Sequence, residues 1–188
     1  GLVVNLHNDI DVPFAKPGST PVYLAQMREV LARHPKTTIV WAHTGLGRVI
    51  RPIGHHVAYL SAILSDPKLA HVHFDISWDE VAKYVVESEA SLRLSAELIG
   101  RYPDRFLFGT DEVGPPDTAT HLRVFERYAP LWKALGPETT QKVLKRNYER
   151  LFDRARRDVR AWERAHAPKA ARQPQKKADT AAETVMPR

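Results

Sequence analysis

The sequence predicts an α/β fold with parallel strands, and three features of the chain lead to this expectation. Four short runs rich in Val, Ile, Phe and Trp recur at residues 2–7, 37–43, 71–77 and 105–111. Stretches with helical periodicity separate them, and this alternation is the order expected for parallel strands joined by right-handed crossovers. The runs are almost continuously apolar, as strands buried on both faces are.

Two of the intervening helices are marked by capping residues. Thr20 as a cap and Pro21 at the first helical position predict a helix that ends before Pro35. Ser77 and Glu80 have the spacing of a capping box, which predicts the start of a helix after the third strand.

Two further helices are predicted from periodicity alone, over residues 90–103 and 118–136. The chain thus contains four strand and helix units. Four units make either half of an eight-unit barrel or a small open doubly wound sheet, and periodicity does not choose between these two folds.

The C-terminal part of the chain divides into a helix and a tail. After Asn147 one helical stripe is predicted to dock on the body of the protein, formed by Leu151, Phe152, Ala155, Val159 and Trp162. From His166 onward the chain is rich in Pro, Ala, Lys and Gln, with almost nothing to bury, which predicts a disordered tail. We therefore expect one domain over residues 1–165 and a tail over 166–188.

Composition excludes several classes of protein. The chain has 188 residues, 43% of them hydrophobic, and no cysteine, so disulfides, thiolate metal sites and cysteine nucleophiles are excluded while the cellular compartment stays open. No run of eighteen apolar residues and no basic N-terminal segment occurs, which predicts neither a membrane span nor a signal peptide. The chain begins at Gly1 rather than at a methionine, and we expect residues upstream of it.

The net charge of +6 comes from the C-terminal part alone. Residues 1–144 carry 15 Lys and Arg against 16 Asp and Glu, whereas the remainder carries 13 against 6. Because the arginines of that remainder alternate with acidic residues along one predicted helix, we interpret them as a solvated helix face and expect no nucleic-acid partner.

Polar side chains follow each of the predicted strands. His7 ends the first run, His43 the second, Asp75 and Ser77 the third, and Asp111 the fourth. In parallel α/β folds the carboxyl ends of the strands share one edge, where sites collect. Two imidazoles and a carboxylate at that edge could bind a divalent metal, although each residue taken singly also has a structural interpretation.

Four segments resemble a known family. "VVNLHND", "TTIVWAHTG", "RFLFGTDEV" and "NYERLF" resemble, in order, the strand-five, strand-six, strand-eight and closing-helix segments of the amidohydrolase-related metal-dependent hydrolases. One branch of that family contains zinc-dependent aromatic acid decarboxylases. The resemblance covers residues 1–153 and implies the C-terminal half, about strands 5 to 8, of a TIM-type (β/α)8 barrel followed by a long helix and the tail.

The resemblance also implies roles for individual residues. It makes His7 a ligand of a divalent metal, zinc first among the candidates, and Asp111 both a metal-side carboxylate and the general base. His43 becomes the catalytic histidine that polarises the substrate or orients water. The family's first strand normally supplies a His-x-His pair, which we expect upstream of Gly1, so the metal shell is expected to be incomplete here.

Other candidates carry weaker signals. His71 and His73 have the His-x-His spacing, but the pair begins its strand, so at least His71 is expected at the opposite end of the barrel. Asp75 is closer to the mouth and could support the site. His55 and the adjacent His56 point apart and make a poor chelating pair, and Arg48 could meet a substrate carboxylate or simply lie on the surface.

The function expected from these features is hydrolysis of a small-molecule carbonyl compound, such as an amide, lactone or ester, by metal-activated water. Two alternatives stay open: a metal-dependent decarboxylase of an aromatic acid, and a barrel fragment without catalytic activity. The unpaired sheet edges of half a barrel leave formation of a homo-oligomer open as well.

Overall fold

The computed structural model describes residues 1–16, 18–47 and 55–167, and at its centre lies one parallel sheet. The strand order is β1-β2-β3-β4, formed by β1 (Val3–Leu6), β2 (Thr38–Trp41), β3 (Val72–Asp75) and β4 (Phe106–Leu107). All three strand pairs are parallel. The predicted mixed α/β fold with parallel strands is therefore confirmed, and it is consistent with a fragment of a TIM-type barrel.

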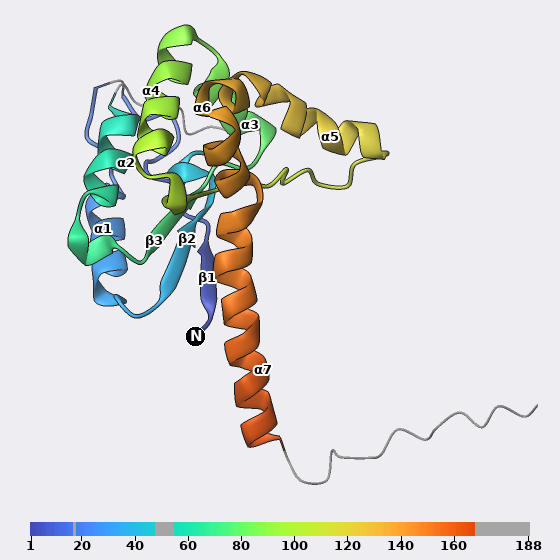
Figure 1. The fold of residues 1–188 in the computed structure, drawn as a ribbon. Helices are drawn as coiled ribbons and strands as arrows, with labels where there is room; N and C mark the ends of the chain where they lie inside the picture. The colour runs from blue at the N-terminus through green and yellow to red at the C-terminus, as the bar shows by residue number, and fades with distance from the viewer. Residues whose placement is uncertain (17, 48–54, 168–188) are drawn as a thin grey trace, which may run out of the picture.

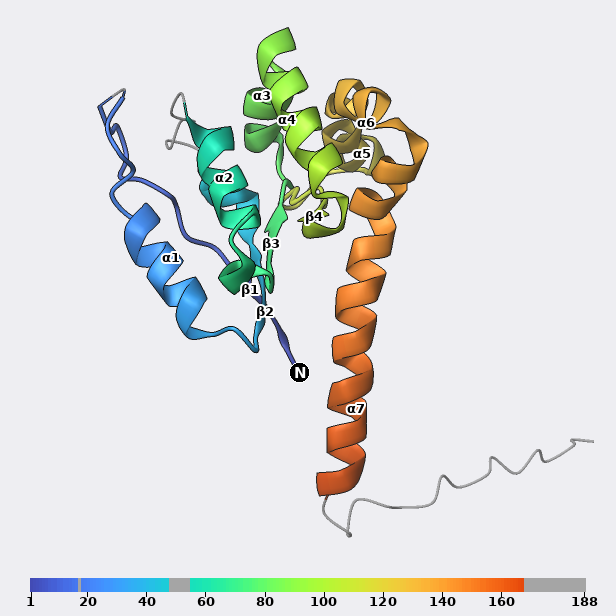
Figure 2. The same ribbon diagram turned by 60° about the vertical axis from the view of Figure 1, so that its left-hand side comes forward.

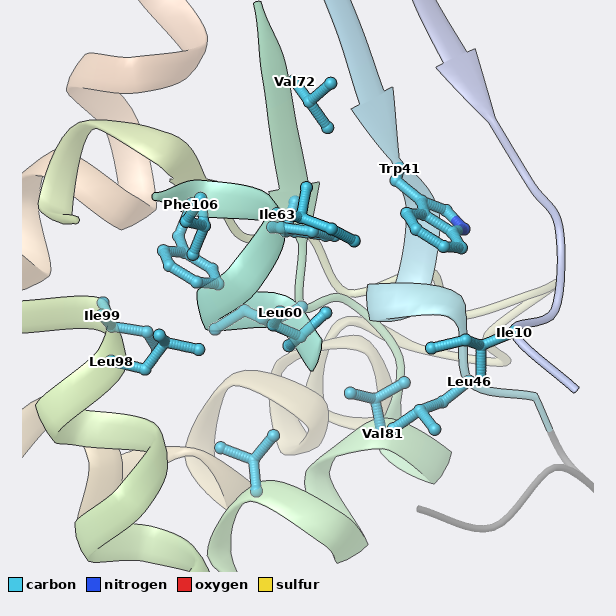
Figure 3. Packing of buried hydrophobic residues seen from close by; sticks show 14 of the residues in the cluster. Ile10, Trp41, Leu46, Leu60, Ile63, Val72, Val81, Leu98, Ile99 and Phe106 are labelled. Atoms are coloured by element: carbon cyan, nitrogen blue, oxygen red, sulfur yellow. The ribbon is translucent and has the colours of Figure 1, made fainter. Parts of the chain in front are cut away.

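Helices cover one face of this sheet. In Figures 1 and 2, α1 (Leu24–Arg33) and α2 (His56–Leu64) lie on the same side of the strands, and α4 (Glu89–Arg101) adds to this layer. The main hydrophobic core fills the space between helices and strands (Figure 3). Its centre is a row of buried aromatic rings from three strands, Trp41, Phe74 and Phe106, with centroids 5.9 Å apart at both contacts.

Three more helices gather near the carboxyl ends of the strands (Figures 1 and 2): α3 (Asp79–Val86), α5 (Thr118–Arg127) and α6 (Ala129–Gln141). The single helix predicted over residues 118–136 is wrong, because the chain breaks at Tyr128. That ring is fully buried, and its hydroxyl donates a hydrogen bond to the carbonyl of Ile76 at 2.5 Å, with the carbonyl of Trp78 3.1 Å away. This anchor ties the α5–α6 junction to the segment after β3.

One predicted helix start and one predicted helix cap are also wrong. α1 begins at Leu24, not after Thr20, because Asp11 Oδ1 accepts the Val22 amide at 3.0 Å and fixes the preceding residues in a loop. α3 begins at Asp79 without a side-chain cap, and the Ser77 hydroxyl donates to Asp75 instead. The helix predicted over 90–103 is confirmed as α4, which Ser88 caps.

The opposite face of the sheet carries a smaller apolar cluster. Val40, Leu107 and Leu151 are buried there, with Val3 and Phe152 packed against them. Leu151 and Phe152 belong to the second of two π-helical segments, Lys142–Arg146 and Glu149–Asp153, which lead into the long helix α7 (Arg154–His166).

The predicted docking stripe of the last helix is only partly correct. α7 has no buried residue and runs away from the sheet (Figures 1 and 2). Trp162 is 62% exposed and stacks on His166, because the body ends before it can cover this part of the helix. Ion pairs such as Arg160 with Glu163 lie along the exposed face. Among the described residues, no helix has the length and apolar character to cross a membrane, and residues 168–188 of the expected tail lie outside them.

Two buried histidines make stability depend on pH. Burial lowers the pKa of His56 to about 4, and burial together with the charges of Arg105 and Arg150 lowers the pKa of His73 to about 4. In the unfolded chain both imidazoles titrate near 6.5, so between pH 6.5 and 4 the unfolded state binds protons that the folded state excludes.

We therefore expect the free energy of unfolding to be highest above about pH 6.5 and to fall towards pH 4, by up to about 3 kcal/mol per imidazole. Urea unfolding at a series of pH values measures this dependence. His73→Gln should remove part of it, whereas His55→Gln, at an exposed position, should leave it unchanged. Equal pH dependence in both variants would contradict the assignment.

Candidate functional site

Residues from all four strand ends meet around His43. The His7 and His43 rings make an edge contact with centroids 5.0 Å apart, and His43 Nε2 lies 3.5 Å from Asp111 Oδ2. On the other side of the ring, Nδ1 lies 3.3 Å from the Ser77 hydroxyl and 3.9 Å from Asp75 Oδ2. The structure thus brings together the strand-end residues that the sequence singled out.

A strained turn places His43 at this position. Ala42–Gly45 form a 3₁₀ turn directly after β2, in which His43, Thr44 and Gly45 have φ values of 56°, 54° and 74°. Left-handed backbone is costly for His and Thr, at roughly 1–2 kcal/mol each. The turn folds the imidazole back over the sheet edge, where it is only 6% exposed.

Left-handed residues also follow the next two strands. Trp78, after β3, has a φ of 85°, and Asp111, after β4, has a φ of 47°. Such conformations concentrate at functional sites, where the surrounding structure holds them in place. The Trp78 ring lies 5.2 Å from the His43 ring, so this strained residue forms part of the wall around the imidazole.

A chain of hydrogen bonds orients His43. Asp75 accepts the Ser77 amide at 2.9 Å through Oδ1 and the Ser77 hydroxyl at 2.5 Å through Oδ2. Since the hydroxyl proton points to Asp75, the Ser77 oxygen is left to accept a hydrogen bond from His43 Nδ1–H. This network assigns the proton of the neutral ring to Nδ1 and leaves Nε2 as an acceptor that faces Asp111.

The two carboxylates beside His43 differ in their environment. The Asp75 side chain is 14% exposed, and its burial raises the pKa of the carboxyl group, against the opposing effect of the Ser77 hydrogen bonds and His43. The Asp111 side chain is 48% exposed and lies on the open side of the ring. One carboxylate therefore fixes the imidazole from behind, while the other can meet a molecule from solvent.

His7 lies at the more exposed side of the site. Its side chain is 63% exposed, and Nε2 is 3.7 Å from Asp9 Oδ1. That carboxylate oxygen is buried and has no hydrogen-bond partner among the described residues. Gly47 leaves the space that Asp9 occupies, because a Cβ on Gly47 would come within 2.8 Å of the same oxygen.

These donors suit a divalent metal by their chemistry, since neutral imidazoles and carboxylates are ordinary zinc ligands. They do not form a complete site, however. Within residues 1–16, 18–47 and 55–167, no three His, Cys, Asp or Glu side chains converge so that they could hold a metal ion. Among the described residues, His7 and Asp111 can therefore supply only some of the ligands that a metal ion needs.

The remaining candidates lie apart from this cluster or outside the described residues. Arg48 belongs to the segment 48–54, which is not described. His71, just before β3 and at its amino end as expected, has Nε2 2.9 Å from the carbonyl of Leu31, whereas His73 lies within the strand with Nδ1 3.3 Å from the carbonyl of His71.

Sequence reasoning missed the part played by Ser77 and Trp78. Ser77 was interpreted as a helix cap, because Ser and Glu at this spacing are typical of one. The signal that could have corrected this is Asp75 two residues earlier, since an aspartate can accept hydrogen bonds from the backbone and hydroxyl of the residue after next. Nothing in the local sequence indicates that Trp78 contacts His43.

Gly45 allows a direct test of the strained turn. A Cβ on Gly45 would lie 2.9 Å from the Trp41 ring, and its φ of 74° disfavours any side chain. Gly45→Ala should lower the free energy of unfolding by at least about 2 kcal/mol. Gly100→Ala is the matched control, because Gly100 lies in α4 with open space around it and should be unchanged or up to about 1 kcal/mol more stable. Urea unfolding of both variants measures the difference, and equal stabilities would contradict the account of the turn.

The tautomer of His43 tests the hydrogen-bond chain. In the wild type, nitrogen-15 NMR of the imidazoles should show neutral His43 with its proton on Nδ1. Ser77→Ala should shift the population towards the Nε2–H form, because Nδ1 then keeps only the longer 3.4 Å contact with the Ser77 carbonyl. Ser95→Ala, a serine outside this chain of hydrogen bonds, is the control. A wild-type ring protonated on Nε2 would rule the assignment out.

Comparison with known proteins identifies the family of the chain. The family described as amidohydrolase matches residues 1–154, which is most of the 188 residues. Comparisons with curated proteins and with solved structures gave no match. Since the family match spans all four strands, the strand-end residues and the start of the closing helix, the chain belongs to the amidohydrolase family.

Proposed function

We propose that this protein hydrolyses a small-molecule carbonyl compound, such as an amide, lactone or ester, with His43 and Asp111 as its catalytic residues. Membership of the amidohydrolase family supports metal-dependent, hydrolase-like chemistry. The observation that carries the proposal is the placement of His43, which Asp75 and Ser77 hold through Nδ1 while Nε2 faces Asp111 at the carboxyl edge of the sheet.

The proton steps follow from the two sides of the ring. When His43 takes up a second proton at Nε2, the resulting imidazolium is flanked by the carboxylates of Asp75 and Asp111. Nε2–H can then donate a hydrogen bond to a substrate carbonyl oxygen and stabilise the negative charge that develops there. The half-exposed carboxylate of Asp111 takes a proton from the attacking water as the water oxygen bonds to the carbonyl carbon, and it returns that proton to the leaving group.

A divalent metal, when bound, polarises the carbonyl group and lowers the pKa of water. We propose zinc as this metal, with His7 and Asp111 as the ligands from this chain and the other ligands from outside the described residues. This agrees with the wider proposal that the chain forms the second half of a (β/α)8 barrel whose first half supplies a His-x-His pair. The parallel strand order and the shared carboxyl edge support it.

Metal binding by the chain tests the proposal that its set of metal ligands is incomplete. Because His7 and Asp111 alone leave most coordination positions to water, we expect zinc to bind with a Kd weaker than about 1 μM. Calorimetric titration measures the affinity, and both His7→Ala and Asp111→Asn should weaken it further. His34→Ala, at an exposed position at the end of α1, is the control. Tight stoichiometric zinc in the wild-type chain would contradict the incomplete shell.

Activity tests the roles of the side chains. With zinc supplied, a panel of aryl esters, lactones and anilides should reveal hydrolysis, and His43→Asn and Asp111→Asn should each lower kcat/KM by about 10²–10⁴-fold. His34→Asn should leave it unchanged.

Two results would overturn the hydrolase proposal. Release of carbon dioxide from an aromatic acid, without hydrolysis of any panel compound, would identify a decarboxylase. Absence of both reactions in the zinc-supplied chain and in a longer chain with upstream residues would identify a protein without catalytic activity.

A further inference from the structure

Asp9, two residues after His7, has a carboxylate oxygen that lacks a hydrogen-bond donor. The side chain as a whole is 37% exposed, but its Oδ1 is buried and has no partner among the residues that the structure describes. A buried acceptor without a donor is costly, and in native proteins such groups are rare. His7 Nε2 lies 3.7 Å from this oxygen, which is slightly beyond the length of a hydrogen bond.

The Asp9 carboxylate packs directly against the backbone of Gly47. A Cβ on Gly47 would lie 2.8 Å from Oδ1, 3.2 Å from Oδ2 and 3.3 Å from the carboxyl carbon. The carboxylate thus fills the space that a side chain at position 47 would need. It cannot move further in that direction to find a donor.

The backbone on both sides of Asp9 is fixed as well. The carbonyl of Asn8 accepts a 2.7 Å hydrogen bond from the buried indole of Trp41. The amide of Ile10 donates a 2.7 Å hydrogen bond to the carbonyl of Gly45, and the Ile10 side chain lies in the hydrophobic core (Figure 3). These contacts hold the Asp9 carboxylate in one place, whatever the state of the site.

The His7 ring is the part of this pair that can move. Its side chain is 63% exposed, so a small rotation can bring Nε2–H to the buried oxygen of Asp9. A carboxylate is a stronger acceptor than a neutral group, which favours this contact. A neutral imidazole with its proton on Nε2 keeps a lone pair on Nδ1. In metal sites, a histidine ligand commonly donates its other ring N–H to a carboxylate, which fixes the tautomer and the orientation of the ring.

We propose that Asp9 is a positioning residue for His7: its Oδ1 accepts a hydrogen bond from His7 Nε2–H, so that Nδ1 is the nitrogen that binds the metal. The hydrogen bond follows from the geometry of the loop after β1, whereas the role of Nδ1 rests on the proposed function. The two histidines of the site are then held in opposite tautomers, His7 with its proton on Nε2 and His43 with its proton on Nδ1.

The tautomer of His7 tests the hydrogen bond without metal or substrate. In nitrogen-15 NMR of the full chain at a pH of about 8.5, where an exposed imidazole is neutral, wild-type His7 should show only the Nε2–H form. Asp9→Ala should return His7 to a mixture of both neutral tautomers. This variant should keep its fold, because the flanking contacts use backbone groups of Asn8 and Ile10. Asp104→Ala, at an exposed position, is the matched control and should leave His7 unchanged.

Zinc provides the second arm of the experiment. Added zinc should move the Nδ1 signal of wild-type His7, and calorimetry should show zinc binding at least about tenfold weaker in Asp9→Ala but unchanged in Asp104→Ala. Both neutral tautomers in the wild type, equal populations in the wild type and Asp9→Ala, or zinc bound through Nε2 would overturn the proposal. If the wild type binds no zinc, the role of Nδ1 is overturned and the tautomer alone decides the hydrogen bond. Absence of hydrolysis would overturn only the proposed function, because neither arm uses a substrate.

Discussion

The packing of Trp41 holds the segments of the site in one arrangement. Its ring is fully buried at the end of β2, beside the Phe74 ring of β3, and its Nε1–H donates a 2.7 Å hydrogen bond to the carbonyl of Asn8. The same ring leaves room only for a hydrogen atom on Gly45. One side chain therefore fixes the loop after β1, the turn after β2 and the neighbouring strand. The positions of His7 and His43 relative to each other depend on these three contacts.

The electrostatics of the site follow from this arrangement. Because His43 is held in a nearly buried turn, its two ring nitrogens face groups of different exposure, with Ser77 and Asp75 behind the ring and Asp111 in front. A neutral ring with its proton on Nδ1 brings a lone pair towards the Asp111 carboxylate, which is unfavourable. A proton at Nε2, or a cation at that position, relieves this repulsion. The position in front of Nε2 therefore suits a hydrogen-bond donor or a cation, as the proposed hydrolysis requires.

Much of this could be predicted from the sequence, because strands and strand ends depend on local patterns. The four apolar runs predicted the four strands, and the expected parallel order was sufficient to place His7, His43 and Asp111 at one edge of the sheet. What could not be predicted depends on contacts between distant segments. Ser77 has the spacing of a helix cap, but in the structure its hydroxyl donates to Asp75 and accepts from His43. The start of α1 shifts because Asp11 accepts a hydrogen bond from the Val22 amide.

The docking stripe of the last helix and the burial of His56 also depend on contacts that a local sequence pattern does not contain. The periodicity of residues 151–162 correctly predicts a helix, yet only the body of the protein decides how much of its apolar face is covered, and Trp162 lies beyond that body. His55 and His56 are adjacent and identical in type, yet His55 precedes α2 and is exposed, whereas His56 is the first residue of the helix and is buried. No local pattern indicates that the buried ring will lack a donor for Nδ1.

Thr44 links the strained turn after β2 to the start of α2. Its hydroxyl accepts a hydrogen bond from His56 Nε2–H and donates one to the carbonyl of His43. The three groups therefore form one directed chain of hydrogen bonds from α2 to the strained turn. Hydrogen bonds in such a chain polarise one another. The left-handed turn is therefore tied through Thr44 to the first residue of α2.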